Sequence, residues 1–325
     1  MNLLVIGGTI FLGRHLVRTA LAAGYKVTTF NRGTYNLPEQ NNVEQIHGDR
    51  TRDLQLLEGR HWDAVIDTCG MEASSVESSV EFFSRSTAKY VFISSISAFH
   101  NFRELNMTEK AEARILRVDQ QQDYGSQKAR CEQIVSERFA KNALLIRPGL
   151  IVGPYDATDR FTYWPQRISS GGEILAPGQE NRHIQFIDVR DLSEWVIRII
   201  ASGKSGLFNA TGPGFVYTMQ QFLHDCISVC GVESKLTWMP DEKLKQAEVK
   251  PWTELPLWIP ESDTEYRGFM EIDCSKAQNT GLSYRSPSQT IQDTLQWYRS
   301  VAAGRELKAG LSAEKERELL RLFKS

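Results

Sequence analysis

Short runs of apolar residues alternate with helical patterns along the first half of the chain. The runs that predict buried strands are residues 1–6, 26–30, 43–47, 64–67 and 90–95. After the first run, Leu12, Leu16, Val17 and Ala20 recur at helical spacing, and a long helix is expected at residues 72–86. Strands that alternate with helices predict an α/β fold of the Rossmann type, a doubly wound parallel sheet that binds ligands at the carboxyl ends of its strands.

The second half predicts the rest of this sheet and a smaller C-terminal substrate-binding domain. Residues 1–154, completed by about 184–212, are expected to form the dinucleotide-binding domain, and residues 155–183 and 213–325 the substrate-binding region. The expected elements are a return to the sheet at 183–187, helices at 189–200, 219–230 and 313–323, and a strand at 207–209. Three prolines and two tryptophans within residues 251–260 predict a rigid loop over the cleft.

An aromatic segment with one arginine occupies residues 155–165. Phe161, Tyr163 and Trp164 are candidates to line an apolar pocket in which Arg160 meets an anion. The alternative is that these aromatic side chains pack a small second core.

The first predicted strand runs into a glycine-rich turn and then into a helix, an arrangement typical of dinucleotide binding, with pyrophosphate on the helix N-terminus. Gly7 permits the tight turn, Gly8 lets the backbone approach phosphate, and Gly13 lets helix and strand pack closely. Ile10 replaces the usual middle glycine, and its branched side chain is expected to crowd a bound pyrophosphate. A glycine-rich turn without a ligand is the alternative.

Side chains after the next strands are candidates to bind the rest of the cofactor. Asn31 and Arg32 follow the second strand, where an NAD-specific site usually has an acidic residue. Arg32 suits a 2′-phosphate, so NADP is favoured, with NAD as the alternative. Asp49 is placed to accept a hydrogen bond from the adenine amino group, and Thr68 and Cys69 are small enough to lie beside a cofactor.

Tyr124 and Lys128 lie four residues apart at the start of a predicted helix, so their side chains share one face. Tyrosine alone is a poor proton donor, because its pKa is about 10. A nearby ammonium favours the phenolate and is expected to lower that pKa toward the working pH. The pair predicts proton transfer to a carbonyl or from an alcohol, against the alternative of an ordinary exposed helix pair.

Composition narrows the class of protein. The 325 residues are 41% hydrophobic and carry a formal net charge of −2, which makes nucleic acid an unlikely partner. Five widely spaced cysteines indicate reduced thiols, with Cys226 and Cys230 packed in the interior, and no metal site is expected.

No apolar run approaches the roughly 18 residues of a membrane span, so we expect a cytoplasmic protein without a membrane partner. The last helix is expected to pack on the body or on the partner subunit of a homodimer.

Several short motifs occur in a characteristic order. They are Gly7-Gly-Thr-x-Phe-Leu-Gly13, Gly48-Asp49, Phe92-Ile-Ser-Ser-Ile-Ser-Ala-Phe99, Tyr124-Gly-Ser-Gln-Lys128, Leu145-Ile-Arg-Pro-Gly-Leu-Ile-Val-Gly-Pro154, Phe186-Ile-Asp-Val-Arg-Asp-Leu192 and Phe208-Asn-Ala-Thr-Gly212. Through about Gly212 the chain resembles the extended short-chain dehydrogenase/reductase family, which includes sugar-nucleotide epimerases, dehydratases and reductases. The replacement at Ile10 is similar to an atypical branch that includes chloroplast stem-loop-binding proteins.

The resemblance implies roles for individual residues. Tyr124 is the implied general acid/base, Lys128 holds the nicotinamide ribose and lowers the tyrosine pKa, and Ser95 hydrogen-bonds the reacting oxygen. The implied cofactor-binding residues are Gly7, Gly8, Thr9, Ile10, Phe11, Leu12, Gly13, Asn31, Arg32, Asp49, Thr68, Cys69, Lys128 and Pro148.

Two departures from the family pattern narrow the activity. Family dehydratases follow the active Ser/Thr with an acidic pair, whereas this chain has Ile96 and Ser97, so dehydration is disfavoured. Leu150 replaces an asparagine that usually helps to bind the diphosphate of a nucleotide sugar. We therefore expect an NAD(P)-dependent oxidoreductase or epimerase that acts on a small carbonyl or alcohol by hydride transfer and Tyr124-mediated proton transfer. The alternatives are an RNA-binding or a dinucleotide-sensing protein of the same fold without turnover.

Overall fold

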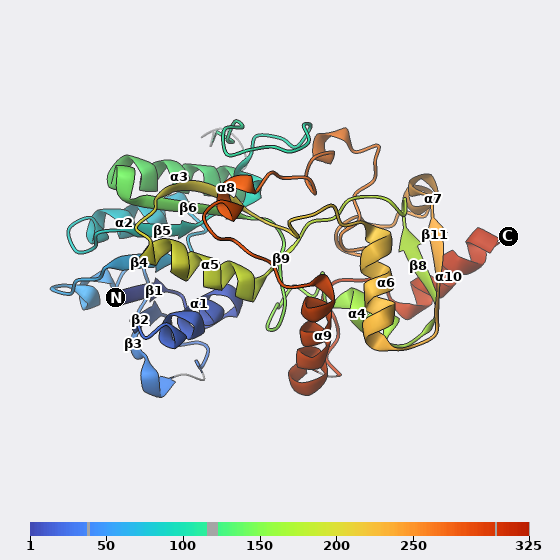
Figure 1. Ribbon diagram of the computed structural model, residues 1–325, viewed down its shortest axis with the longest axis horizontal. Helices are drawn as coiled ribbons and strands as arrows, with labels where there is room; N and C mark the ends of the chain where they lie inside the picture. Colours follow the sequence, from blue (N-terminus) through green and yellow to red (C-terminus); the bar gives the residue numbers. More distant parts are fainter. Residues whose placement is uncertain (38–39, 116–122, 303, 325) are drawn as a thin grey trace.

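The computed structural model describes residues 1–37, 40–115, 123–302 and 304–324, and the chain folds around a seven-stranded parallel sheet (Figure 1). In spatial order the strands are β10 (Gly206–Ala210), β6 (Ala143–Pro148), β5 (Tyr90–Ile93), β4 (Ala64–Asp67), β1 (Asn2–Ile6), β2 (Lys26–Asn31) and β3 (Glu44–His47). Strands β4, β5 and β6 are buried along their whole length, as expected for parallel strands covered on both faces.

The order of the strands reverses direction at β1. After β1 the chain adds β2 and β3 on one side, and it then crosses over to add β4, β5, β6 and β10 on the other. Doubly wound sheets bind ligands in the crevice that such a reversal leaves at the carboxyl ends of the strands. The Rossmann-type fold predicted from the sequence is confirmed.

Helices cover both faces of the sheet. They are α1 (Phe11–Ala22) and α5 (Val189–Ala201) on one face and α2 (Ala73–Phe83) and α3 (Tyr124–Phe139) on the other (Figure 1). Leu3 and Val5 of β1 belong to the core under α1 and α5, whereas Leu4 and Ile6 belong to the core under α2 and α3. Successive side chains of a strand point to opposite faces of the sheet, so the single apolar run of β1 contributes to both cores.

The helices and strands of the C-terminal half lie beside the sheet (Figure 1). They enclose a hydrophobic core of their own, called the second core below. It is built by α4 (Tyr163–Ile168), α6 (Met219–Cys230), α7 (Asp241–Gln246), α9 (Pro287–Trp297), α10 (Ala313–Lys324) and the parallel strands β8 (Gly172–Pro177) and β11 (Ser234–Met239). Phe161, Tyr163 and Trp164 belong to this core and are at most 3% exposed. Their assignment to a substrate pocket is therefore wrong, and the alternative of a second core holds.

The expected return of residues 183–187 to the central sheet is also wrong. β9 (Ile187–Asp188) pairs instead with β7 (Ile151–Val152) in a separate two-stranded sheet. The chain rejoins the central sheet at β10, against which the short helix α8 (Ser275–Gln278) packs. A short apolar run predicts a strand, but it carries no information about which strand becomes its neighbour.

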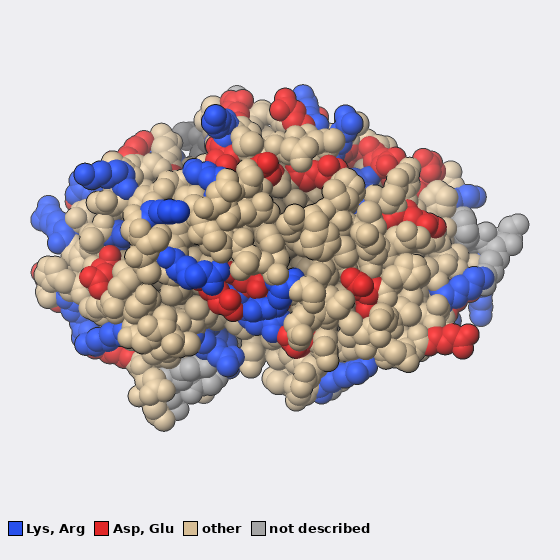
Figure 2. Space-filling model, in the orientation of Figure 1, with Lys and Arg blue, Asp and Glu red and all other residues tan. Residues whose placement is uncertain are grey.

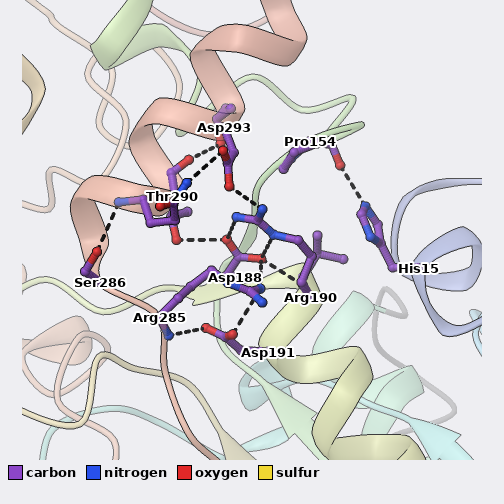
Figure 3. A network of polar contacts seen from close by, with 12 residues as sticks. His15, Pro154, Asp188, Arg190, Asp191, Arg285, Ser286, Thr290 and Asp293 are labelled. Carbon is purple, nitrogen blue, oxygen red and sulfur yellow. Dashed lines mark hydrogen bonds and ion pairs between the residues drawn. The ribbon is translucent and has the colours of Figure 1, made fainter. Parts of the chain in front are cut away.

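A buried ion-pair network ties the end of β9 to α9 (Figure 3). Asp188 is 3% exposed and accepts hydrogen bonds from Arg190 Nη2 at 2.6 Å, Arg285 Nη1 at 3.1 Å and Thr290 Oγ1 at 2.8 Å. Arg190 also pairs with Asp293 of α9. Burial opposes the charge of Asp188, but the hydrogen bonds and the two arginines hold its pKa below the usual value. Breaking a buried pair typically costs about 3–5 kcal/mol, so the network fixes the second core against the sheet.

The cysteines of the chain are free thiols. Cys226 is fully buried in α6, as predicted, and Cys230 is half-buried. Within the described parts of the chain, no helix combines the length and the apolar composition that a membrane crossing requires.

Candidate active site

A cleft of about 860 Å³ opens at the carboxyl ends of the central strands. Its walls include all of the predicted catalytic and cofactor-binding residues, namely Gly7, Gly8, Thr9, Ile10, Phe11, Leu12, Gly13, Asn31, Arg32, Asp49, Thr68, Cys69, Ser95, Tyr124, Lys128 and Pro148. Residues that are up to about 140 positions apart in the sequence therefore share one site. Their individual roles stay predictions.

The glycine-rich turn between β1 and α1 has a backbone that only glycine adopts easily. Gly7 has a φ of +99°, and a Cβ atom there would lie 2.5 Å from Thr68 Oγ1. A Cβ atom on Gly13 would lie 2.8 Å from the backbone nitrogen of Gly8. The turn is thus folded closely against both the neighbouring strand end and the first turn of α1.

Ile10 and Phe11 connect this turn to the helix. Ile10 occupies the N-cap position of α1, makes no side-chain cap hydrogen bond, and is 50% exposed in the wall of the cleft. Phe11 follows with a φ of +36°, which is unusual for a residue with a side chain. The Ile10 side chain therefore offers no acceptor to the first N–H groups of α1, which can donate to a phosphate in the cleft.

We expect Ile10→Gly to tighten NADPH binding by about three- to tenfold, or about 0.6–1.4 kcal/mol, because a branched side chain leaves the path of the pyrophosphate. Fluorescence titration of the wild type and the variant measures the change. Ile10→Ala is the matched control, since it removes the bulk without adding backbone freedom, and it should show most of the gain. Unchanged or weaker affinity in both variants would mean that the phosphates pass elsewhere.

The start of α3 is positioned by two short-range contacts. Asp123 caps the helix by accepting hydrogen bonds from Ser126 N at 3.1 Å and Ser126 Oγ at 2.7 Å. A Cβ atom on Gly125 would lie 2.2 Å from the carbonyl oxygen of Ser97, so a glycine is needed where α3 meets the segment after β5. This close approach brings Tyr124 to Ser95.

Tyr124 and Ser95 both line the cleft, and the Ser95 side chain lies close enough to Tyr124 to favour its phenolate. Ser95 Oγ accepts from Ser97 N at 3.1 Å, which fixes the serine side chain. Tyr124 is 45% exposed as a whole, yet desolvation by the cleft walls raises its pKa, while the Ser95 side chain and the Arg160 charge act in the opposite direction. The expected lowering of the tyrosine pKa is therefore wrong.

Lys128 is buried beneath the tyrosine. Its ammonium donates to the carbonyl oxygens of Gly70 at 2.9 Å and Ile93 at 2.8 Å, and it lies 5.8 Å from the centroid of the Tyr124 ring. Burial lowers the pKa of Lys128. Arg160 is a second cation near Tyr124, and its charge favours the phenolate.

The residues predicted to contact the adenosine end lie together at the ends of β2 and β3. Arg32 is exposed, and Asn31 Oδ1 accepts a hydrogen bond from Gly33 N at 2.9 Å. Asp49 Oδ1 accepts from Thr51 N at 2.8 Å and Thr51 Oγ1 at 2.6 Å, and these bonds lower the pKa of Asp49. Asp49 is therefore held as a carboxylate at the rim of the cleft.

Sequence reasoning missed an ion pair beside the cleft. Arg50 binds the fully buried Asp67 through two hydrogen bonds of 2.9 and 2.7 Å, and Tyr90 Oη donates to Asp67 Oδ2 at 2.8 Å. Asp67 Oδ1 also accepts from the backbone N–H of Cys69 at 3.1 Å, which shapes the turn after β4. The sequence feature that could have revealed this ion pair is Asp67, an acidic residue at the end of an otherwise apolar strand.

The remaining wall comes from distant segments. Arg160 and Trp252 both line the cleft, and the guanidinium lies 5.4 Å from the centroid of the Trp252 ring. Phe269 lines the same wall. The proline-rich loop thus contributes Trp252 to the cleft as predicted, whereas Trp258 is buried in the second core.

A doubly wound parallel sheet with a glycine-rich turn, and a cleft lined by Ser95, Tyr124 and Lys128, are features of the short-chain dehydrogenase/reductase class. The model of the NAD dependent epimerase/dehydratase family matches residues 3–210, and the chain belongs to this family. The resemblance inferred from the sequence motifs is confirmed.

One similar protein is the chloroplast stem-loop binding protein of 41 kDa b of Arabidopsis thaliana. It is 25% identical over 234 residues, which are 66% of this chain and 60% of that protein. This chain thus spans less than two thirds of the length of that relative.

Two solved structures are similar over nearly the whole chain. The UDP-glucose 4-epimerase of Thermotoga maritima, solved with UDP-glucose, has a TM-score of 0.69 at 15% identity, covering 93% of this chain and 100% of the epimerase. The dTDP-glucose 4,6-dehydratase of Bacillus anthracis, solved with NAD, has a TM-score of 0.69 at 18% identity, covering 94% and 98%. At these identities the likeness establishes a common fold.

Proposed function

We propose that the protein is an NAD(P)-dependent oxidoreductase or epimerase that acts on a small carbonyl or alcohol. The observation that carries the proposal is that Ser95, Tyr124 and Lys128 line the same cleft as the glycine-rich turn. A protein that only senses a dinucleotide has no need for two hydroxyl groups at this place. Family membership supports the dinucleotide part of the proposal.

The residues of the cleft fit a dinucleotide. The glycine-rich turn and the first turn of α1, which has no N-cap side-chain hydrogen bond, both line the cleft, and this suits a pyrophosphate. Asp49 would hold the adenine amino group and Lys128 the nicotinamide ribose. When bound, NAD(P) supplies or accepts the hydride.

Tyr124 and Ser95 would together hold the reacting oxygen of the substrate. As a carbonyl becomes an alcohol, Tyr124 donates its proton to that oxygen, and it takes a proton back in the reverse direction. Its raised pKa keeps Tyr124 protonated at neutral pH, which suits the donating step. Arg160 would stabilise the phenolate that remains after the proton has left, because its positive charge already favours that form.

The substrate-facing wall favours a compound that is partly apolar and carries an anionic group. Trp252 and Phe269 offer aromatic surface, and Arg160 offers a cation beside Tyr124. Leu150 and Ile96 supply apolar groups to the cleft, which argues against a nucleotide-sugar diphosphate and against dehydration. In this proposal, residues 155–183 and 213–325 form the substrate-binding region.

RNA binding is the second candidate, because the chloroplast relative is named for stem-loop binding. The chain has 38 lysines and arginines against 40 acidic residues, and on the face in Figure 2 the two kinds are interspersed. Tight binding to phosphates needs a clustered basic surface. We therefore place RNA binding below the enzymatic function.

NADPH is expected to bind about tenfold more tightly than NADH, or by about 1.4 kcal/mol, because Arg32 can pair with the 2′-phosphate. Fluorescence titration with both cofactors measures this preference. Arg32→Gln should abolish the preference, and Arg52→Gln, which changes an exposed arginine outside the cleft, should preserve it. Equal affinities in the wild type would remove the role of Arg32. Failure to bind either cofactor, with tight RNA binding at physiological salt, would replace the enzyme by the RNA-binding candidate.

A further inference from the structure

A second pocket of about 300 Å³ adjoins the glycine-rich turn. It shares Thr9, Ile10, Phe11 and Tyr35 with the main cleft. The rest of its lining comes from the first turns of α1, the segment after β7, the end of α9 and the chain that follows, and consists of Arg14, Tyr155, Ala157, Trp297, Arg305 and Lys308. None of the functional roles above uses these six residues.

The pocket has an excess of positive charge. Arg305 is neutralised, because its guanidinium donates to the buried Asp159 at 2.6 and 2.5 Å. In the described part of the chain, Arg14 and Lys308 form no ion pair with an acidic side chain. Arg14 instead lies 4.0 Å from the centroid of the Tyr155 ring. Two cations at one small pocket favour a negatively charged occupant.

Two N–H donors beside this pocket also lack acceptors. Arg14 Nε and Trp297 Nε1 are both shielded from solvent and have no hydrogen-bond partner among the described residues. A buried donor without an acceptor typically costs about 1–3 kcal/mol, so such groups are rare and usually have an unseen partner. An acceptor that enters the pocket would satisfy both donors once the two side chains turn toward it.

The aromatic rings give the pocket a defined shape. Tyr155 lies between Arg14 and Trp297, and its ring centroid is 5.6 Å from that of Trp297 at an angle of 51°. Tyr155 also has a φ of +74°, a conformation that side-chain-bearing residues rarely adopt. The Tyr155 ring therefore contacts both of the side chains that carry the unpaired donors.

We propose that this pocket is a binding site for a small oxyanion, a phosphate or carboxylate group, that is separate from the dinucleotide. Arg14, Lys308 and the Trp297 N–H are its ligands. Because Thr9, Ile10 and Phe11 line both cavities, the anion and the dinucleotide affect each other's affinity by the same factor. This coupling rests on the proposed cofactor binding, whereas the anion site itself does not.

Titration with inorganic phosphate at constant ionic strength, balanced with sodium chloride, tests the site. Saturable quenching of tryptophan fluorescence and a rise in unfolding temperature are expected for the wild type. Arg14→Met and Lys308→Met should each weaken phosphate binding at least about tenfold, the loss of one charge-assisted hydrogen bond. The matched controls Arg321→Met and Lys235→Met, which change exposed residues elsewhere, should bind as the wild type does. Sodium acetate in place of phosphate distinguishes a carboxylate from a phosphate ligand, and saturable binding of either supports the site.

A second titration, in saturating NADPH, distinguishes a separate ligand from the phosphates of the cofactor. Saturable phosphate binding that persists there and still depends on Arg14 supports the proposal. Complete competition by NADPH would overturn it, because the pocket would then belong to the cofactor site. Equal affinity in all variants, or no binding by the correctly folded wild type, would overturn it as well. The titration without NADPH stands even if the protein binds no dinucleotide, so the two proposals can fail separately.

Discussion

Tyr124→Phe is expected to lower turnover by about a hundred- to ten-thousandfold while cofactor affinity changes little, because the variant loses only the hydroxyl that transfers the proton. The measurement is oxidation of NADPH with carbonyl compounds chosen by screening, beside a cofactor titration. Since burial raises the pKa of Tyr124, reduction by the wild type should be constant through neutral pH. It should fall in alkaline solution as the tyrosine loses its proton.

Tyr266→Phe is the matched control for this variant. It also removes one phenolic hydroxyl, but Tyr266 is 40% exposed and lies outside the cleft, so its turnover should equal that of the wild type. If Tyr124→Phe retained wild-type turnover, the tyrosine would be a structural residue of α3 and the dinucleotide-sensing alternative would take precedence.

Lys128→Met is expected to damage both cofactor binding and turnover, because the lysine is assigned to the nicotinamide ribose. The variant also leaves the carbonyl oxygens of Gly70 and Ile93 without their buried donor, which should destabilise the fold by about 1–3 kcal/mol for each unpaired group. Cofactor titration, turnover and thermal unfolding of the same preparation separate the three effects.

Lys89→Met controls for the loss of a buried lysine. Lys89 is 8% exposed and donates to the carbonyl oxygens of Gly203 and Lys204, away from the cleft. It should lower stability to a similar extent but leave cofactor affinity unchanged. Equal cofactor affinities in the two variants would assign Lys128 a structural role alone.

The fold was largely predictable because its main features are local. A run such as Ala64–Asp67 predicts a buried strand by itself, and Gly7 predicts the turn that follows β1. The sequence could also predict that the site residues lie in one cleft. Each of them was assigned to a strand end or a helix start by a local signal, and parallel strands bring their carboxyl ends to one edge of the sheet. In each of these cases the signal lies within a few residues of the element that it predicts.

The errors concern contacts between distant segments. Nothing near Phe161 indicates that Phe186 and Phe222 will surround it in a second core. The pKa of Tyr124 was misjudged because the sequence does not show how strongly the cleft walls desolvate its hydroxyl. The spacing also cannot show that the Lys128 ammonium donates to the carbonyls of Gly70 and Ile93. The Arg50–Asp67 pair likewise forms only when two strand ends are brought together.

The position of β10 has a consequence during synthesis of the chain. β6 ends at Pro148, and its neighbour β10 is complete only at Ala210, 62 residues later (210 − 148). At about 5–20 residues per second, a ribosome needs about 3–12 s to make this stretch. During that interval one edge of β6, whose residues are all buried in the final fold, has no neighbouring strand. We expect the nascent chain to recruit chaperones most strongly between these two lengths.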